Sequence, residues 1–257
     1  MNIEDVKNDD RFEKSDEEDN LYFLIQLQGL SLICNYHKNG RLQIEDPNIE
    51  KNDKLLSHGS RKNYYESGKL KSEIPYKEGV RHGIGRTYYE SGKLENETSF
   101  RENEMEGILK SYYESGKLKM ELPFKNGLKE GISKSYYESG KLEYETPHKA
   151  DKREGIVKGY HENGKLALEA LYKADKAEGI VKQYYESGKL ELEAPYKAGE
   201  KEGTAKLYRE NGDMYATITF ANGSPVSGIC HSKNGKTRPL TNAELENWEN
   251  SFDIECE

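Results

Sequence analysis

Residues 83–100 read GIGRTYYESGKLENETSF, and this stretch decides the fold. Its centre, YYESGKL at 88–94, returns at 64–70, 112–118, 136–142 and 184–190, and diverged copies stand at 160–166 and 208–214. Polar and apolar residues alternate on both sides of Ser91-Gly92, as in half-buried strands joined by a hairpin turn. Glycine or proline recurs inside every repeat, which excludes a regular helix. The stretch therefore predicts a β-hairpin that the chain repeats.

The turn glycines keep a constant step of 24 residues along the chain: Gly68, Gly92, Gly116, Gly140, Gly164, Gly188 and Gly212. Gly40 and Gly235 lie in less regular flanking units, as expected of the terminal repeats of a repeat protein. We therefore predict an all-β fold. It is an elongated, twisted, single-layer antiparallel β-meander of tandem 24-residue hairpin repeats, followed by a short C-terminal helix.

This pattern divides the chain into four parts. Residues 1–20 are acidic and predicted to be disordered, and residues 21–58 hold capping strands and an irregular first repeat. Residues 59–237 form the hairpin array, and residues 238–257 form a C-terminal capping helix and tail.

The C-terminal part carries a helix start signal. Thr241 and Glu244 have the spacing of a capping box, in which each side chain satisfies a backbone N–H of the first helical turn. The helix that they open would present Leu245, Trp248 and Phe252, and it would cover the end of the sheet.

Hairpin register follows from the turn. A two-residue turn at Ser91-Gly92 places Tyr89 opposite Leu94 and pairs a basic residue with a glutamate in each hairpin. Because opposite charges across two strands help to define register, we interpret these pairs as a structural charge ladder and not as catalytic groups. The pairs are Lys62 with Glu73, Arg86 with Glu97, Lys110 with Glu121, Lys134 with Glu145, Lys158 with Glu169, and Lys182 with Glu193.

The two tyrosines of each repeat should point to opposite faces, because side chains alternate along a strand. The second one, such as Tyr89, joins the leucine of the motif on the apolar face and is interpreted as core. The first one joins the charged face, where a tyrosine that stays in contact with water suits recognition. The candidate partner-binding residues are therefore Tyr64, Tyr88, Tyr112, Tyr136, Tyr160, Tyr184 and Tyr208.

Composition restricts the class of protein. Hydrophobic and charged residues each make up 33% of the 257 residues, which is too polar for a thick core, and the net charge of -8 disfavours nucleic acid as a partner. Cys34, Cys230 and Cys256 are few and far apart, so no disulfide framework is predicted and a reducing compartment is favoured. The acidic start resembles no signal peptide, and residues 21–34 are too short and polar for a membrane span. We therefore predict a cytoplasmic protein, with association at a surface left open.

No catalytic signature is present in the sequence. It contains no phosphate-binding glycine motif and no nucleophile elbow. The histidines fall in different columns of the repeat, without the matched spacing of metal ligands: His37, His58, His82, His148, His161 and His231. The chain is predicted not to be an enzyme and to bind neither a cofactor nor a metal.

The repeated unit resembles the bacterial variant of the MORN repeat. The resemblance rests on Y-Y-E-S/N-G-K-L-x-x-E, then an aromatic residue with K-x-G, then G-I-x-K, and it covers roughly residues 36–237. It implies an elongated antiparallel meander that serves as a binding or assembly surface without catalysis. Some bacterial members are labelled antitoxins, and eukaryotic relatives have been associated with membranes and with dimerisation.

Two functions follow as hypotheses. The first is a non-enzymatic repeat scaffold that binds another protein, in its more specific form an antitoxin or immunity partner whose acidic balance suits a basic target. The alternative is peripheral association with a membrane, in which tyrosines and lysines of the charged face meet lipid headgroups.

Overall fold

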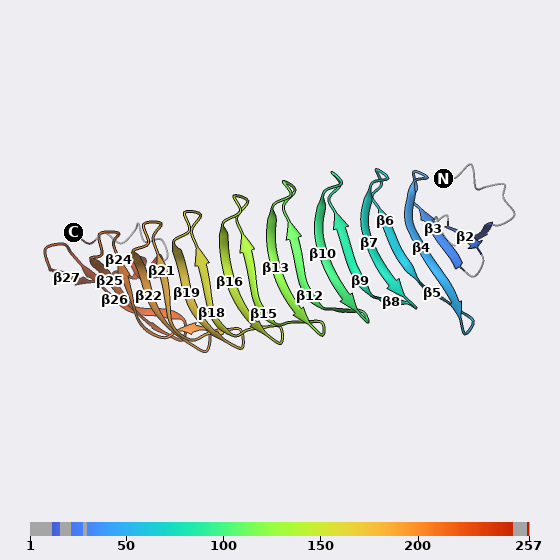
Figure 1. Ribbon diagram of the computed structural model, residues 1–257. Helices are drawn as coiled ribbons and strands as arrows, with labels where there is room; N and C mark the ends of the chain where they lie inside the picture. The colour runs from blue at the N-terminus through green and yellow to red at the C-terminus, as the bar shows by residue number, and fades with distance from the viewer. Residues whose placement is uncertain (1–11, 16–21, 28–29, 249–255, 257) are drawn as a thin grey trace. The chain divides into compact units, whose positions relative to one another are not determined.

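The computed structural model describes residues 12–15, 22–27, 30–248 and 256. The chain divides into two compact units, residues 1–128 and 129–257, and both consist of antiparallel β-hairpins (Figure 1). One short helix stands near the C-terminus of the described chain. The predicted fold class, an all-β antiparallel meander of hairpin repeats with a C-terminal helix, is therefore confirmed.

The strands of the first unit are β1 (Phe12–Ser15), β2 (Tyr22–Leu27), β3 (Leu30–Tyr36), β4 (Leu42–Lys51), β5 (Lys54–Ser57), β6 (Gly59–Tyr64), β7 (Leu70–Lys77), β8 (Val80–Arg81), β9 (Gly83–Tyr88), β10 (Leu94–Arg101), β11 (Glu104–Met105), β12 (Gly107–Tyr112) and β13 (Leu118–Lys125). The two-residue strand β14 (Leu128–Lys129) contains the boundary between the units.

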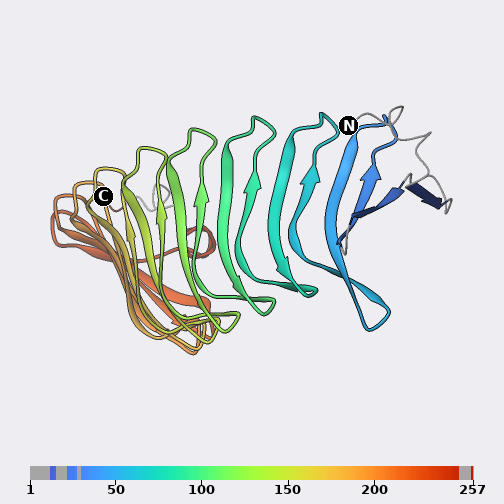
Figure 2. The same cartoon turned by 45° about the vertical axis from the view of Figure 1, so that its right-hand side comes forward.

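The second unit contains β15 (Gly131–Tyr136), β16 (Leu142–Lys149), β17 (Lys152–Arg153), β18 (Gly155–Tyr160), β19 (Leu166–Lys173), β20 (Lys176–Ala177), β21 (Gly179–Tyr184), β22 (Leu190–Lys197), β23 (Glu200–Lys201), β24 (Gly203–Tyr208), β25 (Met214–Ala221), β26 (Ser224–His231), β27 (Thr237–Pro239) and α2 (Asn242–Glu246). Both views show the long strands of each unit side by side, with the turns of the repeated motif along one edge (Figures 1 and 2).

The predicted disordered segment, residues 1–20, is described only in part. Residues 12–15 form β1, which pairs antiparallel with β2 so that Phe12 lies opposite Ile25. Residues 1–11 and 16–20 lie outside the described residues.

The hairpin turn differs from the two-residue turn expected at Ser91-Gly92. The N–H of Tyr89 donates to the carbonyl of Lys93, and the N–H of Gly92 donates to the carbonyl of Tyr89, which makes a three-residue loop. Gly92 has a φ of 90°, a left-handed conformation that glycine adopts without steric cost. As a result Tyr88, and not Tyr89, lies opposite Leu94.

A β-bulge in the return strand compensates for the longer turn. The register shifts between Leu94 and Asn96, which leaves Glu95 as the extra residue. The longer loop shifts the register by one residue in one direction, and the bulge shifts it back. For this reason Arg86 lies opposite Glu97, although the turn was expected to be shorter.

One face of each unit carries the buried residues, and we call it the core face. In the second unit its centre consists of small and branched side chains with almost no exposed area: Ala170, Ala194, Ala205, Ala216 and Ile218. A single layer of strands leaves room for small residues there, and larger aromatic rings such as Phe220 lie near one end of the strands. In the first two repeats of the first unit the positions equivalent to Leu207 and Ala216 are polar, and Asn63 and Asn96 donate to Ser72 and Thr87.

The second tyrosine of each repeat was interpreted as core, but the structure shows a half-buried side chain that joins neighbouring hairpins. In the first unit Tyr65 and Tyr89 donate from their hydroxyls to the carbonyls of Tyr88 and Tyr112, both at 2.7 Å. The same bond recurs in the second unit, from Tyr137 to Tyr160 and from Tyr185 to Tyr208. His161 takes the position of a second tyrosine, and its Nε2 lies 2.6 Å from the carbonyl of Tyr184.

A second set of bonds between hairpins lies at the opposite edge. The carboxylate of Glu154 accepts a hydrogen bond from the N–H of Ala174, and Glu178 accepts one from Ala198. Both alanines have positive φ, so each carboxylate holds a turn of the next hairpin in a strained conformation. Glu154 and Glu178 each stand directly before the glycine that begins a strand, Gly155 and Gly179. This repeated Glu-Gly pair thus has a structural role that its spacing alone did not reveal.

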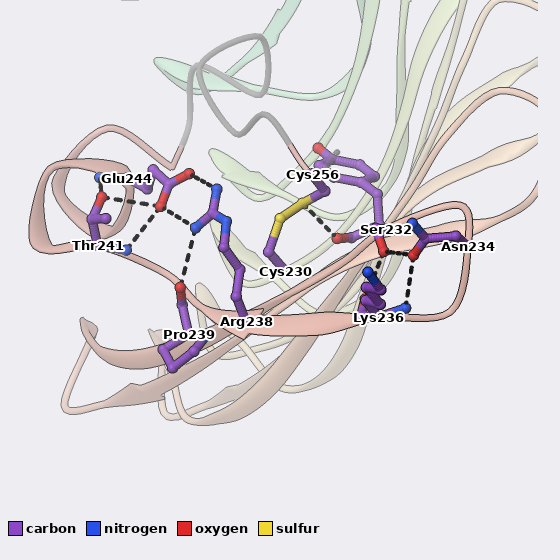
Figure 3. Close-up of a disulfide and its surroundings, with 10 residues drawn as sticks. Cys230, Ser232, Asn234, Lys236, Arg238, Pro239, Thr241, Glu244 and Cys256 are labelled. Atoms are coloured by element: carbon purple, nitrogen blue, oxygen red, sulfur yellow. Dashed lines mark hydrogen bonds and ion pairs between the residues drawn. A yellow bond between two sulfur atoms is a disulfide. The ribbon is translucent and has the colours of Figure 1, made fainter.

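Helix α2 begins with the predicted capping box. Thr241 accepts from the N–H of Glu244, and the Glu244 carboxylate accepts from the N–H of Thr241. The Arg238 guanidinium, followed by hydrogen bonds from Thr241, lowers the pKa of Glu244 to about 2 (Figure 3). Leu245 and Trp248 pack against the core cluster as expected, and Phe252 lies outside the described residues.

The cysteine prediction was wrong. Cys230 and Cys256 form a disulfide, with their Cα atoms 5.6 Å apart (Figure 3). Cys34 is free and buried. Sequence spacing did not indicate the pair because its members, 26 residues apart, meet only once β27 has paired with β26 and the segment after it has packed on the core cluster through Leu245 and Trp248. The disulfide attaches the C-terminus beside Tyr215, whose carbonyl lies 3.1 Å from the Cys256 sulfur.

Replacing Tyr137 with Phe tests the bond between hairpins. The change removes only the hydroxyl that bonds Tyr160, so we expect a loss of about 1 kcal/mol in unfolding free energy. Urea denaturation followed by circular dichroism measures the loss. Tyr144→Phe is the matched control because the Tyr144 side chain is 43% exposed. Equal effects of the two substitutions would contradict this role.

Thiol titration and a cysteine substitution test the disulfide. Without reductant, the denatured protein should titrate one thiol, that of Cys34, whereas a reduced sample should titrate three. A loop of 26 residues predicts that Cys256→Ser lowers the unfolding free energy of the second unit by about 3 kcal/mol. Three thiols in the unreduced protein would show that the bond does not form.

Candidate binding face

The face opposite the core face carries the charge ladder, and we call it the ladder face. In both units the register places each basic residue opposite its glutamate, in all of the pairs expected from the sequence: Lys62 and Glu73, Arg86 and Glu97, Lys110 and Glu121, Lys134 and Glu145, Lys158 and Glu169, and Lys182 and Glu193. The Arg86 guanidinium lies 2.8 Å from the Glu97 carboxylate. Lys134 and Lys182 lie 3.7 Å from Glu145 and Glu193.

The same glutamates also face the basic residue of the next hairpin. Glu145 lies opposite Lys158 across β16 and β18, and Glu193 lies opposite Lys206 across β22 and β24. The Lys206 ammonium is 4.0 Å from Glu193. Positive and negative charges therefore alternate from strand to strand within each unit. Exposed pairs of this kind contribute at most about 1 kcal/mol each, so their main effect is on register.

The seven candidate tyrosines are half-buried in the structure. Tyr64 and Tyr160 donate from their hydroxyls to the carboxylates of Glu45 and Glu145, at 2.8 and 3.1 Å. Tyr208 makes the equivalent bond to Glu193 at 3.4 Å. Three of the tyrosines therefore lie beside the charge ladder and use their hydroxyls to support it, and their side chains are only partly exposed.

These contacts also determine the ionisation of the tyrosines. Burial and then the hydrogen bond to Glu145 raise the pKa of Tyr160. Burial and the bond to Glu45 raise the pKa of Tyr64 in the same direction. Both phenols stay protonated as hydrogen-bond donors at neutral pH, so neither acts as a base there.

A third row on this face was not predicted from the sequence. It consists of the isoleucine that follows the first glycine of strands β9, β12, β15, β18 and β21, and its side chains are between 46% and 56% exposed: Ile84, Ile108, Ile132, Ile156 and Ile180. The sequence shows that this isoleucine recurs every 24 residues. Because β-branched residues are common in strands, its presence did not indicate that the side chain is exposed.

Prolines and a leucine of the return strands lie between these isoleucines. In the second unit Ile132 lies opposite Pro147, and Ile156 lies opposite Leu171. Pro147 packs so closely on the following hairpin that a Cβ at Gly155 would lie 2.9 Å from its Cγ. Gly155 has a φ of 119°, so both space and backbone conformation require glycine there.

The histidines and acidic residues of the described part of the chain are the remaining candidate groups. No group of three or more His, Cys, Asp or Glu side chains there could hold a metal ion. His148, in an aromatic column, lies 3.0 Å from the Ser133 hydroxyl, and burial lowers its pKa. Within the same described residues, no helix is long and apolar enough to cross a membrane.

Among the described residues, the core face of the second unit has a hollow of about 340 Å³. Lys201 extends across it, with its ammonium 4.3 Å from the centre of the Trp248 ring and 5.8 Å from that of Tyr196. A lysine over aromatic rings gains cation–π stabilisation, so this arrangement supports the C-terminal cap.

Comparison with known proteins identifies the repeat. The family model described as "MORN repeat variant" matches residues 57–78, 81–102, 105–126, 129–150, 153–174, 177–198 and 201–222. No curated protein matches this chain. Among solved structures, a porin-like protein from Bacteroides uniformis is 10% identical and covers 89% of this chain and 92% of its own. Its TM-score of 0.21 is too low to support any argument.

Reversing one charge tests the ladder. Glu145→Lys places a lysine between Lys134 and Lys158, so we expect about 1 kcal/mol of destabilisation, part of which salt should relieve. The midpoint of urea unfolding at low and high salt measures both effects. Glu138→Lys is the control, since Glu138 is exposed in a turn. A salt-independent effect would mean that charge repulsion is not its cause.

Proposed function

This chain belongs to the MORN repeat variant family, and on that basis we propose that it is a non-enzymatic scaffold that binds another protein through its ladder face. MORN repeats are tandem repeats used for binding or scaffolding. The observation that carries the proposal is the row of half-exposed isoleucines beside the charge ladder. Apolar groups that recur at one position of a surface are typical of interaction sites, whereas scattered ones are ordinary.

The energetics of such a face suit a protein partner. Burial of the exposed half of one isoleucine contributes about 1 kcal/mol, so the row of one unit can supply several. Ladder charges at the margin would add orientation and specificity more than affinity. The partly exposed side chains of Tyr88 and Tyr160, which lie beyond the ladder, extend the surface with residues common at interfaces.

A more specific form of the proposal is an antitoxin or immunity partner. The net charge of -8 supports a basic target, because opposite net charges raise the rate of association. The resemblance of the repeat to proteins labelled antitoxins also supports it.

Peripheral membrane association is the second candidate. Tyrosine and lysine side chains on one face favour it, since both occur where proteins meet headgroups. Against it, each lysine of the ladder has a glutamate opposite, so the face has no net positive charge to attract anionic lipid. Sedimentation with vesicles of anionic and of neutral lipid separates the two functions.

The disulfide gives information on the redox state of the compartment in which the protein resides. Disulfides persist in oxidising compartments and are rare in the cytosol. The Cys230–Cys256 bond therefore favours an oxidising location over the cytoplasmic one expected from composition.

Capture with matched variants tests the proposal. Ile156→Thr with Ile180→Thr removes apolar surface but keeps β-branched residues, which the same position tolerates at Thr204. We expect wild type to retain a partner from lysate of the native cell, and this variant to lose most of it, with unchanged circular dichroism. Val226→Thr is the control, because Val226 is 57% exposed on β26. Equal capture by both variants would exclude the ladder face, and vesicle binding without capture would favour the membrane.

A further inference from the structure

The hollow on the core face of the second unit lies on the opposite side of the sheet from the ladder face. Its volume of about 340 Å³ is at the lower end of the range of small-molecule sites, about 300–1,000 Å³. Its lining comes from β21, β22, β23 and the segment after α2, and combines apolar with polar side chains: Val181, Gln183, Leu192, Tyr196, Lys201 and Trp248. The hollow therefore has the dimensions and the mixed lining of a ligand site.

The lining side chains are held in place before any ligand arrives. Val181 and Leu192 are buried in the sheet. The Trp248 ring packs edge-on against the buried ring of Phe220, with the two ring centres 5.1 Å apart. Gln183 lies opposite Leu192 in the register of β21 and β22, and it brings an amide that can donate hydrogen bonds. Because these groups need little ordering, a ligand in the hollow binds at a reduced cost in entropy.

A departure from the repeat explains why the core face is hollowed at this place. Arg153 lies over the ring of Tyr172, with its guanidinium carbon 4.0 Å from the ring centre. One repeat later the equivalent residues are Ala177 and Tyr196. Ala177 is buried in one cluster with Tyr196, but its methyl group is too short to cover a ring as the arginine does. The space is left to Lys201 of the following repeat, whose ammonium is 5.8 Å from the centre of the Tyr196 ring.

The charge of the hollow comes from Lys201. Of the described residues that line the hollow, Lys201 alone is charged. The equivalent cation two repeats earlier, Arg153, lies 3.1 Å from the carboxylate of Asp175, whereas the residue that corresponds to Asp175 is Gly223, which has no side chain. An ammonium has three N–H donors, so it can bind an acceptor as well as contact the rings. One positive charge matches a carboxylate better than a phosphate, which carries nearly two negative charges at neutral pH.

From this lining we propose that the hollow binds a small aromatic monocarboxylic acid. Its carboxylate accepts hydrogen bonds from the Lys201 ammonium and the Gln183 amide, and its ring packs on Leu192 and against Trp248. Hydrogen bonds between charged groups are about twice as strong as neutral ones, so the acid binds better than a neutral molecule of the same shape. Aromatic pairs add to the apolar contact. The site lies on the core face and is independent of the scaffold function, which stands or fails separately.

Trp248 is the one tryptophan of the chain, so tryptophan fluorescence reports on the hollow directly. Titration of the full chain with phenylbutanoate should change this emission and saturate, with a matching heat of binding in calorimetry. Phenylbutanamide has the same shape without the charge, and it should bind about tenfold more weakly. Lys201→Met removes the charge but keeps an unbranched side chain, and it should lower the affinity for the acid to that for the amide. Arg153→Met is the control, because it removes a cation over a ring that does not line the hollow.

A second substitution separates the charge of Lys201 from its packing. Lys201→Met also removes the contact with the Trp248 ring, whereas Lys201→Arg keeps a cation that stacks on aromatic rings. The arginine variant should therefore retain the preference for phenylbutanoate over phenylbutanamide.

Three results would overturn the inference. The first is no heat of binding and no saturable change with phenylbutanoate. The second is equal affinity of the wild type for acid and amide, or a preference for the acid that persists in Lys201→Met. The third is binding of a peptide that ends in phenylalanine with a free carboxylate, without binding of phenylbutanoate, which would assign the hollow to the chain end of a partner protein. None of these results involves the isoleucine row, so the scaffold function is tested separately by capture from lysate.

Discussion

Two cancelling shifts in register determine what each hairpin presents. A three-residue turn moves the return strand by one residue, and a bulge at positions such as Glu95 moves it back. Because side chains alternate along a strand, loss of either feature alone would transfer every later residue of the return strand to the opposite face. Glu97 would then leave Arg86, and the residue at the position of Pro147 would leave the exposed row. The charge ladder and the apolar row both depend on this pair of irregularities.

A single layer of strands has little interior, and this explains how so polar a chain folds. Burial is concentrated in small side chains such as Ala194 and Ala205, which cannot supply the free energy of a two-layer core. Hydrogen bonds at both edges compensate, from the second tyrosine at one edge and from glutamates such as Glu154 at the other. At the end of the second unit, Trp248 and the Cys230–Cys256 disulfide cover the larger core that forms around Phe220.

The sequence was sufficient to predict the repeat, the hairpin and the charge pairs, because a single strand register places all of the opposite charges across from each other. The sequence was not sufficient to predict the length of the turn. A two-residue turn and a three-residue turn followed by a bulge both place Arg86 opposite Glu97, so the charge pairs do not distinguish them. The hydroxyl of Tyr137 bonds a carbonyl in the next hairpin, and the alternation of side chains within a strand does not report contacts between hairpins. The cysteine pair was missed because its proximity depends on how Leu245 and Trp248 pack on the core cluster, which spacing does not report.

The hairpin of β24 and β25, in the last repeat that the family model matches, shows that the apolar row is not a requirement of the sheet. At the position of Ile156 and Leu171 it has Thr204 and Thr219, whose hydroxyl oxygens lie 3.1 Å apart. Threonine is β-branched and suits a strand as well as isoleucine does, and it is better solvated when half of it is exposed. If strand propensity alone determined the residue at this position, nothing would favour isoleucine over threonine in the hairpins that precede Thr204. The change to threonine occurs where the capped end of the unit begins, and this supports the binding role proposed for the apolar row.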